Sequence, residues 1–213
     1  MVTLDIFSDP VCPWCYIGKA NLDRALADHP DHPFSVQWHP FQLNPDMPPE
    51  GMPKRAYLEE KFGGKARVDA IHERLREFAR NAGVAMDPDN PQRIPNTLDA
   101  HRLIHWAGIE GVQPAVAAAL MRAYWVEGRD IGDHETLAAI AGENGMDRAA
   151  TLRLLHSDAD ADDIVARDAD ARQKGVTAVP TFLIARQYVV SGAQPPQMWA
   201  QVIADLAAAN PSP

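Results

Sequence analysis

The segment Ser8-Asp-Pro-Val-Cys-Pro-Trp-Cys-Tyr-Ile-Gly18 contains the only two cysteines of the chain, Cys12 and Cys15. It follows an alternating apolar run, Thr3-Leu-Asp-Ile-Phe7, which is typical of a strand. The Ser-Asp-Pro at its start is a turn signal, and Pro13 is favoured at the first position of a helix. The segment therefore predicts a strand, a turn and a helix that begins at the first cysteine.

The rest of the chain predicts strands on either side of a long helical stretch. Phe34-Ser-Val-Gln-Trp38 alternates as a second strand, and the segments 181–185 and 188–190 predict two more, followed by a terminal helix. Asn96 is a preferred N-cap for one of the helices between them. Another of these helices has apolar residues at spacings of three and four, which predict an amphipathic face: Val68, Ile71, Leu75, Phe78 and Ala82.

These patterns predict one α/β fold, interrupted by an all-helical insertion. We expect a β-α-β half (residues 1–50) and a β-β-α half (residues 175–213) to form one four-stranded sheet with helices on both faces. Residues 51–174 would be the helical insertion. We expect Trp38 and Trp199 to lie in the core, and the tail from residue 210 to be frayed.

Charge and hydropathy exclude several kinds of partner. The chain has 213 residues and a net charge of −9, without a run of Lys or Arg. A phosphate-binding surface needs clustered cations, so neither nucleic acid nor a membrane is expected as a partner. The N-terminus lacks the positive region of a signal peptide, and no apolar segment reaches the length of about 18 residues that spans a bilayer. If Met1 is the native start, we expect a cytoplasmic protein, either a monomer or a homodimer.

A Cys-x-x-Cys pair can bind a metal, form a structural bridge or perform redox chemistry. Zinc needs four ligands, and His101 and His105 lie far outside the usual spacing for the other two, so we expect no metal. A static bridge would close too short a loop to add much stability. At a helix N-terminus, free N–H groups and the helix dipole favour a thiolate on Cys12. Cys15 lies one turn later, where it can resolve a mixed disulfide. Two buried, inert cysteines remain the alternative.

A second signal comes near the end of the chain, in Val176-Thr-Ala-Val-Pro-Thr-Phe182. Here Pro180 comes directly before an apolar strand, which makes its peptide bond a candidate for the cis form. Only about 5% of bonds before proline are cis, so the position of this proline matters more than its presence.

Together these features resemble the DsbA-like branch of the thioredoxin superfamily, in which a helical domain is inserted between the two halves of the fold. Within that branch, the chain resembles the cytoplasmic FrnE-like dithiol–disulfide oxidoreductases. The resemblance rests on segments that occur in the same order along nearly the whole chain: Asp9-Pro-Val-Cys-Pro-Trp-Cys-Tyr-Ile-Gly18, Trp38 with Pro40-Phe-Gln-Leu-Asn-Pro45, Asn96-Thr-Leu-Asp-Ala-His-Arg-Leu103 and Val179-Pro-Thr-Phe182.

The resemblance implies a thiol–disulfide oxidoreductase or isomerase that acts on thiols and disulfides of proteins or small molecules. Cys12 would be the nucleophile and Cys15 the resolving cysteine. Pro13 and Trp14 would tune the redox potential. No cofactor would be tightly bound, and glutathione would be a co-substrate.

The resemblance also implies a substrate-binding surface opposite the cysteines. Pro180 would be cis, and the backbone of Val179 would pair with a bound peptide or with glutathione. The segment containing Asn96 and His101 would line the cleft between the two parts of the fold. A helix cap and ordinary helix polarity are the alternative interpretation for these two residues.

Two other functions stay open. The 2-hydroxychromene-2-carboxylate isomerases and the kappa-class glutathione transferases resemble the same inserted architecture, so a glutathione-dependent isomerase or transferase is one of them. Those proteins typically have serine at the position of Cys12 and use the thiol of bound glutathione. A redox-regulated binding or chaperone module is the other, and its cysteine pair would switch affinity without turnover.

Overall fold

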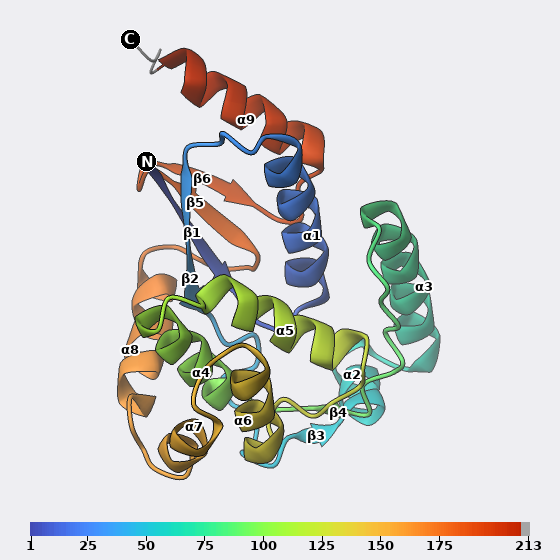
Figure 1. Cartoon of the computed structure of the whole chain (residues 1–213). Helices are drawn as coiled ribbons and strands as arrows, with labels where there is room; N and C mark the ends of the chain where they lie inside the picture. Colours follow the sequence, from blue (N-terminus) through green and yellow to red (C-terminus); the bar gives the residue numbers. More distant parts are fainter. Residues whose placement is uncertain (210–213) are drawn as a thin grey trace.

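The computed structural model describes residues 1–209 and has the expected four-stranded sheet, built from both ends of the chain (Figure 1). The strands are β1 (Val2–Ser8), β2 (Phe34–Pro40), β5 (Thr181–Ile184) and β6 (Tyr188–Ser191), in the order β2-β1-β5-β6. β1 runs parallel to β2 and antiparallel to β5, and β6 is antiparallel to β5. Segments from the two ends of the sequence are therefore neighbours in one sheet.

The alternation in β1 explains why this strand is central. Leu4 and Ile6 are buried, and Leu4 lies opposite Val36 of β2 on one side and Ile184 of β5 on the other. Asp5 is also buried, and its carboxylate accepts a 2.8 Å hydrogen bond from His39 on β2. The strand thus buries apolar side chains while its one acidic side chain keeps a partner.

Two helices from opposite ends of the sequence pack against each other beside the sheet (Figure 1). They are α1 (Pro13–Asp28) and α9 (Pro196–Ala209). Trp199 of α9 is fully buried, and its ring meets that of Phe182 on β5 edge-on, with centroids 4.7 Å apart. Trp38 is also buried, so the expectation that Trp38 and Trp199 are core residues is confirmed.

The segment between β2 and β5 is mostly helical, and most of it lies below the sheet in Figure 1. Its helices are α2 (Lys54–Phe62), α3 (Lys65–Ala82), α4 (Leu98–Ile109), α5 (Gln113–Trp125), α6 (His134–Glu143), α7 (Arg148–Leu155) and α8 (Ala161–Gln173). Of these, α3 stands to the right of α1 in Figure 1. It also contains two short antiparallel strands that the sequence pattern did not indicate, β3 (Met52–Pro53) and β4 (Arg93–Ile94). The domain limits at residues 50 and 174 stay a prediction, and the expected fraying from residue 210 lies outside the described residues.

Helix α3 carries the predicted apolar face, but only part of this face is buried. Val68, Leu75 and Ala82 are buried, whereas Phe78 keeps 38% of its surface exposed. Helix α3 packs against α1, and Val68 and Leu75 line the cavity described below, whereas Phe78 lies outside its wall. Phe78 meets the ring of Trp14 edge-on, with the ring centroids 5.0 Å apart.

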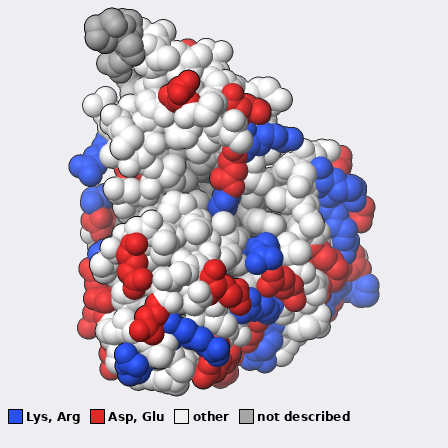
Figure 2. Space-filling model, in the orientation of Figure 1, with Lys and Arg blue, Asp and Glu red and all other residues white. Residues whose placement is uncertain are grey.

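The surface carries acidic and basic side chains in mixture. On the face of the described chain shown in Figure 2, they lie close together over the helical lower part and over α3, and no extended basic patch is seen. Within residues 1–209, no helix is long and apolar enough to cross a membrane.

Candidate active site

Cys12 lies in the turn between β1 and α1, where it is the N-cap residue of the helix. Its backbone N–H donates to the Asp9 carbonyl at 2.9 Å, and Pro13 occupies the first turn of the helix. The side chain of Cys12 makes no capping hydrogen bond, so its sulfur remains available for other contacts. Both Cys12 and Cys15 are free thiols.

The two cysteines have different surroundings. Cys12 contributes to the wall of a cavity of about 290 Å³, whereas Cys15, on the next turn of α1, does not. Cys15 is 1% exposed, and its burial raises the pKa of its thiol well above the ordinary value, an effect increased by the neighbouring Cys12. An incoming disulfide in the cavity therefore meets Cys12 first.

The loop before β5 faces this thiol. The peptide bond between Val179 and Pro180 is cis. The Cys12 sulfur donates a long hydrogen bond, 3.6 Å, to the Val179 carbonyl. Pro180 also closes against α1, because a methyl group added at Gly18 would lie 3.1 Å from the Pro180 ring. This close approach explains the absence of a side chain at residue 18.

The cavity lies between the cysteine turn, the loop before β5 and helices α2, α3 and α5. Its wall includes the predicted site residues Pro13, Trp14 and Val179 as well as Cys12. Most of the wall is apolar or aromatic, with contributions from Leu58, Phe62, Ile71, Leu75, Ile94 and Trp125. A cavity of this composition, with a few polar groups, is typical of a small-molecule site.

A buried polar cluster lies behind the cysteine turn. The Asp9 carboxylate accepts hydrogen bonds from the backbone N–H of Leu43 (2.7 Å) and of Val11 (3.2 Å) and from the Thr97 hydroxyl (3.1 Å). Its complete burial raises the pKa of this carboxyl, although the nearby His101 opposes the shift. The cluster fixes the turn that carries Cys12, because it joins residues 9 and 11 to the chain segments around residues 43 and 97.

His101 belongs to this interior cluster and does not line the cavity. It is 2% exposed, and burial lowers the pKa of its ring below the ordinary value, against the opposing effect of Asp9. Its Nε2 atom has no hydrogen-bond partner among the described residues. A substrate-binding role for His101 stays a prediction.

Asn96 also lies away from the cavity wall and has a structural role. Its side-chain oxygen accepts from the Leu98 N–H at 2.9 Å, and its amide donates to the Met47 carbonyl at 2.7 Å. The helix itself begins one residue later than expected, with Thr97 at the N-cap position. Asn96 therefore accepts a hydrogen bond from a backbone N–H at the start of α4, and its predicted contact with substrate stays untested.

The sequence patterns did not indicate the polar residues of α2 that line the cavity, namely Lys54, Tyr57 and Lys61. The side chains of Tyr57 and Lys61 both donate to the side-chain oxygen of Asn44, at 2.5 Å and 2.7 Å. Lys54 is buried and is considered below. Their spacing of three and four along α2 is a helical pattern, but it gives no sign that the face they share lies opposite a cysteine. Within residues 1–209, no group of three or more His, Cys, Asp or Glu side chains could hold a metal ion.

Comparisons with known proteins place this geometry in a family. The model of the DSBA-like thioredoxin domain matches residues 3–204. The crystal structure of a probable DsbA oxidoreductase from Streptomyces coelicolor is 32% identical, covers 100% of this chain and 92% of its own, and superposes with a TM-score of 0.86.

Two further solved structures share the fold at lower identity. The cytosolic disulfide reductase DsbM from Pseudomonas aeruginosa, also solved with glutathione, is 21% identical with a TM-score of 0.71, covering 97% of this chain and 99% of its own. A 2-hydroxychromene-2-carboxylate isomerase is 18% identical with a TM-score of 0.73, covering 98% and 97%. Because the family model spans nearly the whole sequence, the chain belongs to the family of DSBA-like thioredoxin domains.

Proposed function

We propose that the protein is a thiol–disulfide oxidoreductase or isomerase in which Cys12 attacks and Cys15 resolves. The observation that carries this proposal is the asymmetry of the pair: both thiols are buried, but Cys12 lines the cavity and Cys15, on the next helical turn, does not. Cys12 stands at the N-terminus of α1, the end of a helix at which unpaired N–H groups favour an anion. The membership of the DSBA-like family supports the same chemistry.

The proposed reaction transfers two electrons through a mixed disulfide. The Cys12 thiolate attacks one sulfur of a substrate disulfide, the substrate S–S bond breaks, and one half leaves as a thiolate. Cys15 then loses its proton to solvent and attacks the sulfur of Cys12. This step releases the second half as a thiolate and leaves a Cys12–Cys15 disulfide. In the opposite direction, the oxidised pair accepts two electrons from a substrate dithiol.

Burial in the protein interior acts on the resolving step, in which Cys15 must lose its proton. The raised pKa of Cys15 keeps this thiol protonated until the mixed disulfide has formed. Once Cys12 is part of a mixed disulfide, its own charge no longer opposes ionisation of Cys15, so the attack becomes easier. The order of the two steps thus follows from burial and electrostatics.

The proposal includes the partners and the compartment expected from the sequence. Substrates are protein or small-molecule thiols and disulfides, and glutathione is the proposed co-substrate, since a structural neighbour has been solved with it. A FrnE-like enzyme of the cytoplasm is consistent with a chain that has only two cysteines, both in the site.

Insulin reduction with glutathione or dithiothreitol as the electron source tests the proposal. The wild-type protein should accelerate the reaction, and Cys12→Ser should abolish the acceleration. Cys15→Ser is the matched control, because it keeps the attacking thiol and should accumulate a mixed disulfide on Cys12 that mass spectrometry detects. A Cys15→Ser variant that forms no adduct would contradict the assigned roles.

The same experiment separates the alternative functions. A glutathione-dependent isomerase or transferase would bind glutathione tightly and show no exchange activity in the wild type. A redox-regulated binding module would form the Cys12–Cys15 disulfide without catalytic turnover of insulin.

A further inference from the structure

Lys54 brings a buried positive charge to the cavity that holds Cys12. It is the first residue of α2 and is only 6% exposed. Its ammonium group lies 4.6 Å from the ring centre of Trp125 and 5.4 Å from that of Tyr124, both on α5. Aromatic faces attract a cation, but they do not neutralise its charge.

The hydrogen bonding of this ammonium group is incomplete. Lys54 Nζ donates to the Pro88 carbonyl at 2.7 Å. An ammonium has three N–H donors, and this is the only hydrogen bond that Lys54 Nζ makes with the described residues. The other two N–H donors of Lys54 Nζ have no partner among the described residues, and the side chain of Lys54 forms part of the cavity wall.

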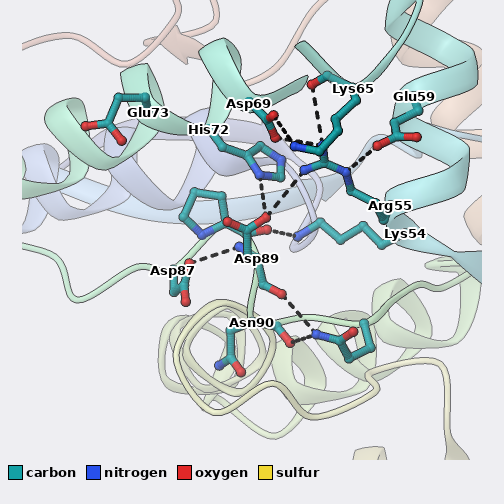
Figure 3. Close-up of polar contacts among 12 residues, drawn as sticks. Lys54, Arg55, Glu59, Lys65, Asp69, His72, Glu73, Asp87, Asp89 and Asn90 are labelled. Carbon is teal, nitrogen blue, oxygen red and sulfur yellow. Dashed lines mark hydrogen bonds and ion pairs between the residues drawn. The ribbon is translucent and has the colours of Figure 1, made fainter. Parts of the chain in front are cut away.

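The carboxylates nearest to Lys54, those of Asp87 and Asp89, have other partners; Figure 3 shows His72 and Arg55 at Asp89. Asp89 is bonded to His72 at 2.8 Å and forms an ion pair with Arg76. Asp87 lies 3.6 Å from the same Arg76 guanidinium. Lys54 consequently forms no ion pair with any residue of the described chain, although Asp87 and Asp89 act on it from a distance.

A buried charge without a counter-ion is costly, and the titration of Lys54 reflects this cost. Burial lowers its pKa from 10.5 to about 8, against the opposing effect of the two aspartates. At neutral pH the cavity therefore contains an ammonium group that lacks an anion. A carboxylate on the ligand would supply both the missing charge and the missing acceptors.

The rest of the cavity wall indicates how polar the remainder of this ligand is. Apart from Lys54, the wall contains the cation Lys61, which is exposed and already bonded to Asn44 and Tyr57. It also contains His72, whose ring is bonded to Asp89 and whose pKa is lowered by burial. The remaining surface is mainly apolar and aromatic. Apart from the backbone of Val179, the wall offers few partners to the backbone groups of an extended peptide, whereas a compact apolar molecule needs few.

Building on the proposed function, we propose that Lys54 determines specificity by binding the carboxylate of a small disulfide with an apolar body, while Cys12 attacks one of its sulfurs. Two electrons pass from the Cys12–Cys15 dithiol to the substrate, its S–S bond breaks, and two thiolates bearing carboxylates leave as the enzyme disulfide forms. Lys54 takes no part in bond making. It positions the anion and lowers the energy of the bound state.

Stopped-flow reduction of two aromatic disulfides by the reduced protein tests this inference. The first, 5,5′-dithiobis(2-nitrobenzoate), carries carboxylates, and the second, 4,4′-dithiodipyridine, is neutral. A hydrogen bond to a charged group corresponds to a factor of about 10 to 100 in binding, so Lys54→Met should lower the rate ratio of the anionic to the neutral disulfide by about that factor. The neutral disulfide reports in the same sample that the variant is folded and that its thiols react.

Lys65→Met is the matched control, because it removes one positive charge from an exposed side chain of the neighbouring helix α3 (Figure 3). It should leave the ratio within about twofold. If Lys54→Met does not fold, Lys54→Gln carries the same test. An unchanged ratio in the Lys54 variant would overturn this inference alone. A wild type that reacts with neither disulfide, or a reaction that survives Cys12→Ser, would overturn the proposed function as well.

Discussion

Replacing Lys54 by methionine should change the pH dependence of folding in a defined way. The pKa of this side chain falls from 10.5 to about 8 because burial disfavours its charged form. One pKa unit corresponds to about 1.36 kcal/mol, so at pH 7, below both values, the folded state carries a penalty of about 3 kcal/mol. At pH 9.5 the folded side chain is largely neutral, and the penalty has fallen to about 1 kcal/mol.

The sign of the effect follows from the direction of the shift. The folded-state pKa lies below the unfolded one, so the penalty is fully present below pH 8 and is relieved as the pH rises from 8 to 10.5. Methionine does not titrate. The free energy of unfolding of the wild type, minus that of Lys54→Met, should therefore rise by about 2 kcal/mol between pH 7 and pH 9.5.

Urea denaturation of the reduced proteins at the two pH values measures this difference. Contributions from the cysteines are common to both proteins and cancel, and the lowered pKa of His72 keeps its titration below the pH range that is compared. Lys54→Met also loses the hydrogen bond to Pro88, which changes the free energy of unfolding at every pH. Only the change of the difference with pH is therefore compared. Lys65→Met should show a constant difference from the wild type. A constant difference for Lys54→Met too would refute the reasoning, since it would mean that the ammonium is solvated in the folded chain.

Three further predictions concern the packing around the site. Burial raises the pKa of Asp9, so its ionisation costs stability as the pH rises above 3.8; the stability of the wild type relative to Asp9→Asn should be greater at pH 4 than at pH 7 in urea titrations. Gly18→Ala should lower the free energy of unfolding by about 1–3 kcal/mol and slow insulin reduction, because the new methyl group would press on Pro180. Trp199→Ala should cost about 3–5 kcal/mol in thermal or urea unfolding, because it removes a fully buried ring that packs on Phe182, and a loss below 1 kcal/mol would contradict this packing.

Much of the fold could be predicted because its signals are local. The alternation of Leu4 and Ile6, the proline at residue 13 and the return to strand patterns after residue 180 each depend on a few neighbouring residues. The position of Cys12 at a helix start follows from the same signals. Trp38 was expected in the core from its size and apolar surface, and it is there.

The cavity could not be predicted, because its walls come from segments far apart in the sequence. In the sequence, Lys54 is a charged residue after a proline, and nothing in its neighbourhood indicates burial. In the fold it is buried and packs against Tyr124 and Trp125 of α5. His101 was expected beside the substrate on the basis of resemblance. The structure places it among the buried polar groups around Asp9. This location depends on how α4 packs against the turn that contains Asp9 and Cys12.

The separation of Cys15 from the cavity has a consequence for damage as well as for catalysis. Oxidants and alkylating agents that enter the cavity meet the sulfur of Cys12, while Cys15 is shielded by the body of α1 and stays protonated. Irreversible oxidation to the sulfinic acid should therefore begin at Cys12. Cys15 can intercept a sulfenic acid formed there by condensing with it to a disulfide, which a cellular thiol can reduce again. Cys15 thus also acts as an internal repair group for the thiol that lines the cavity.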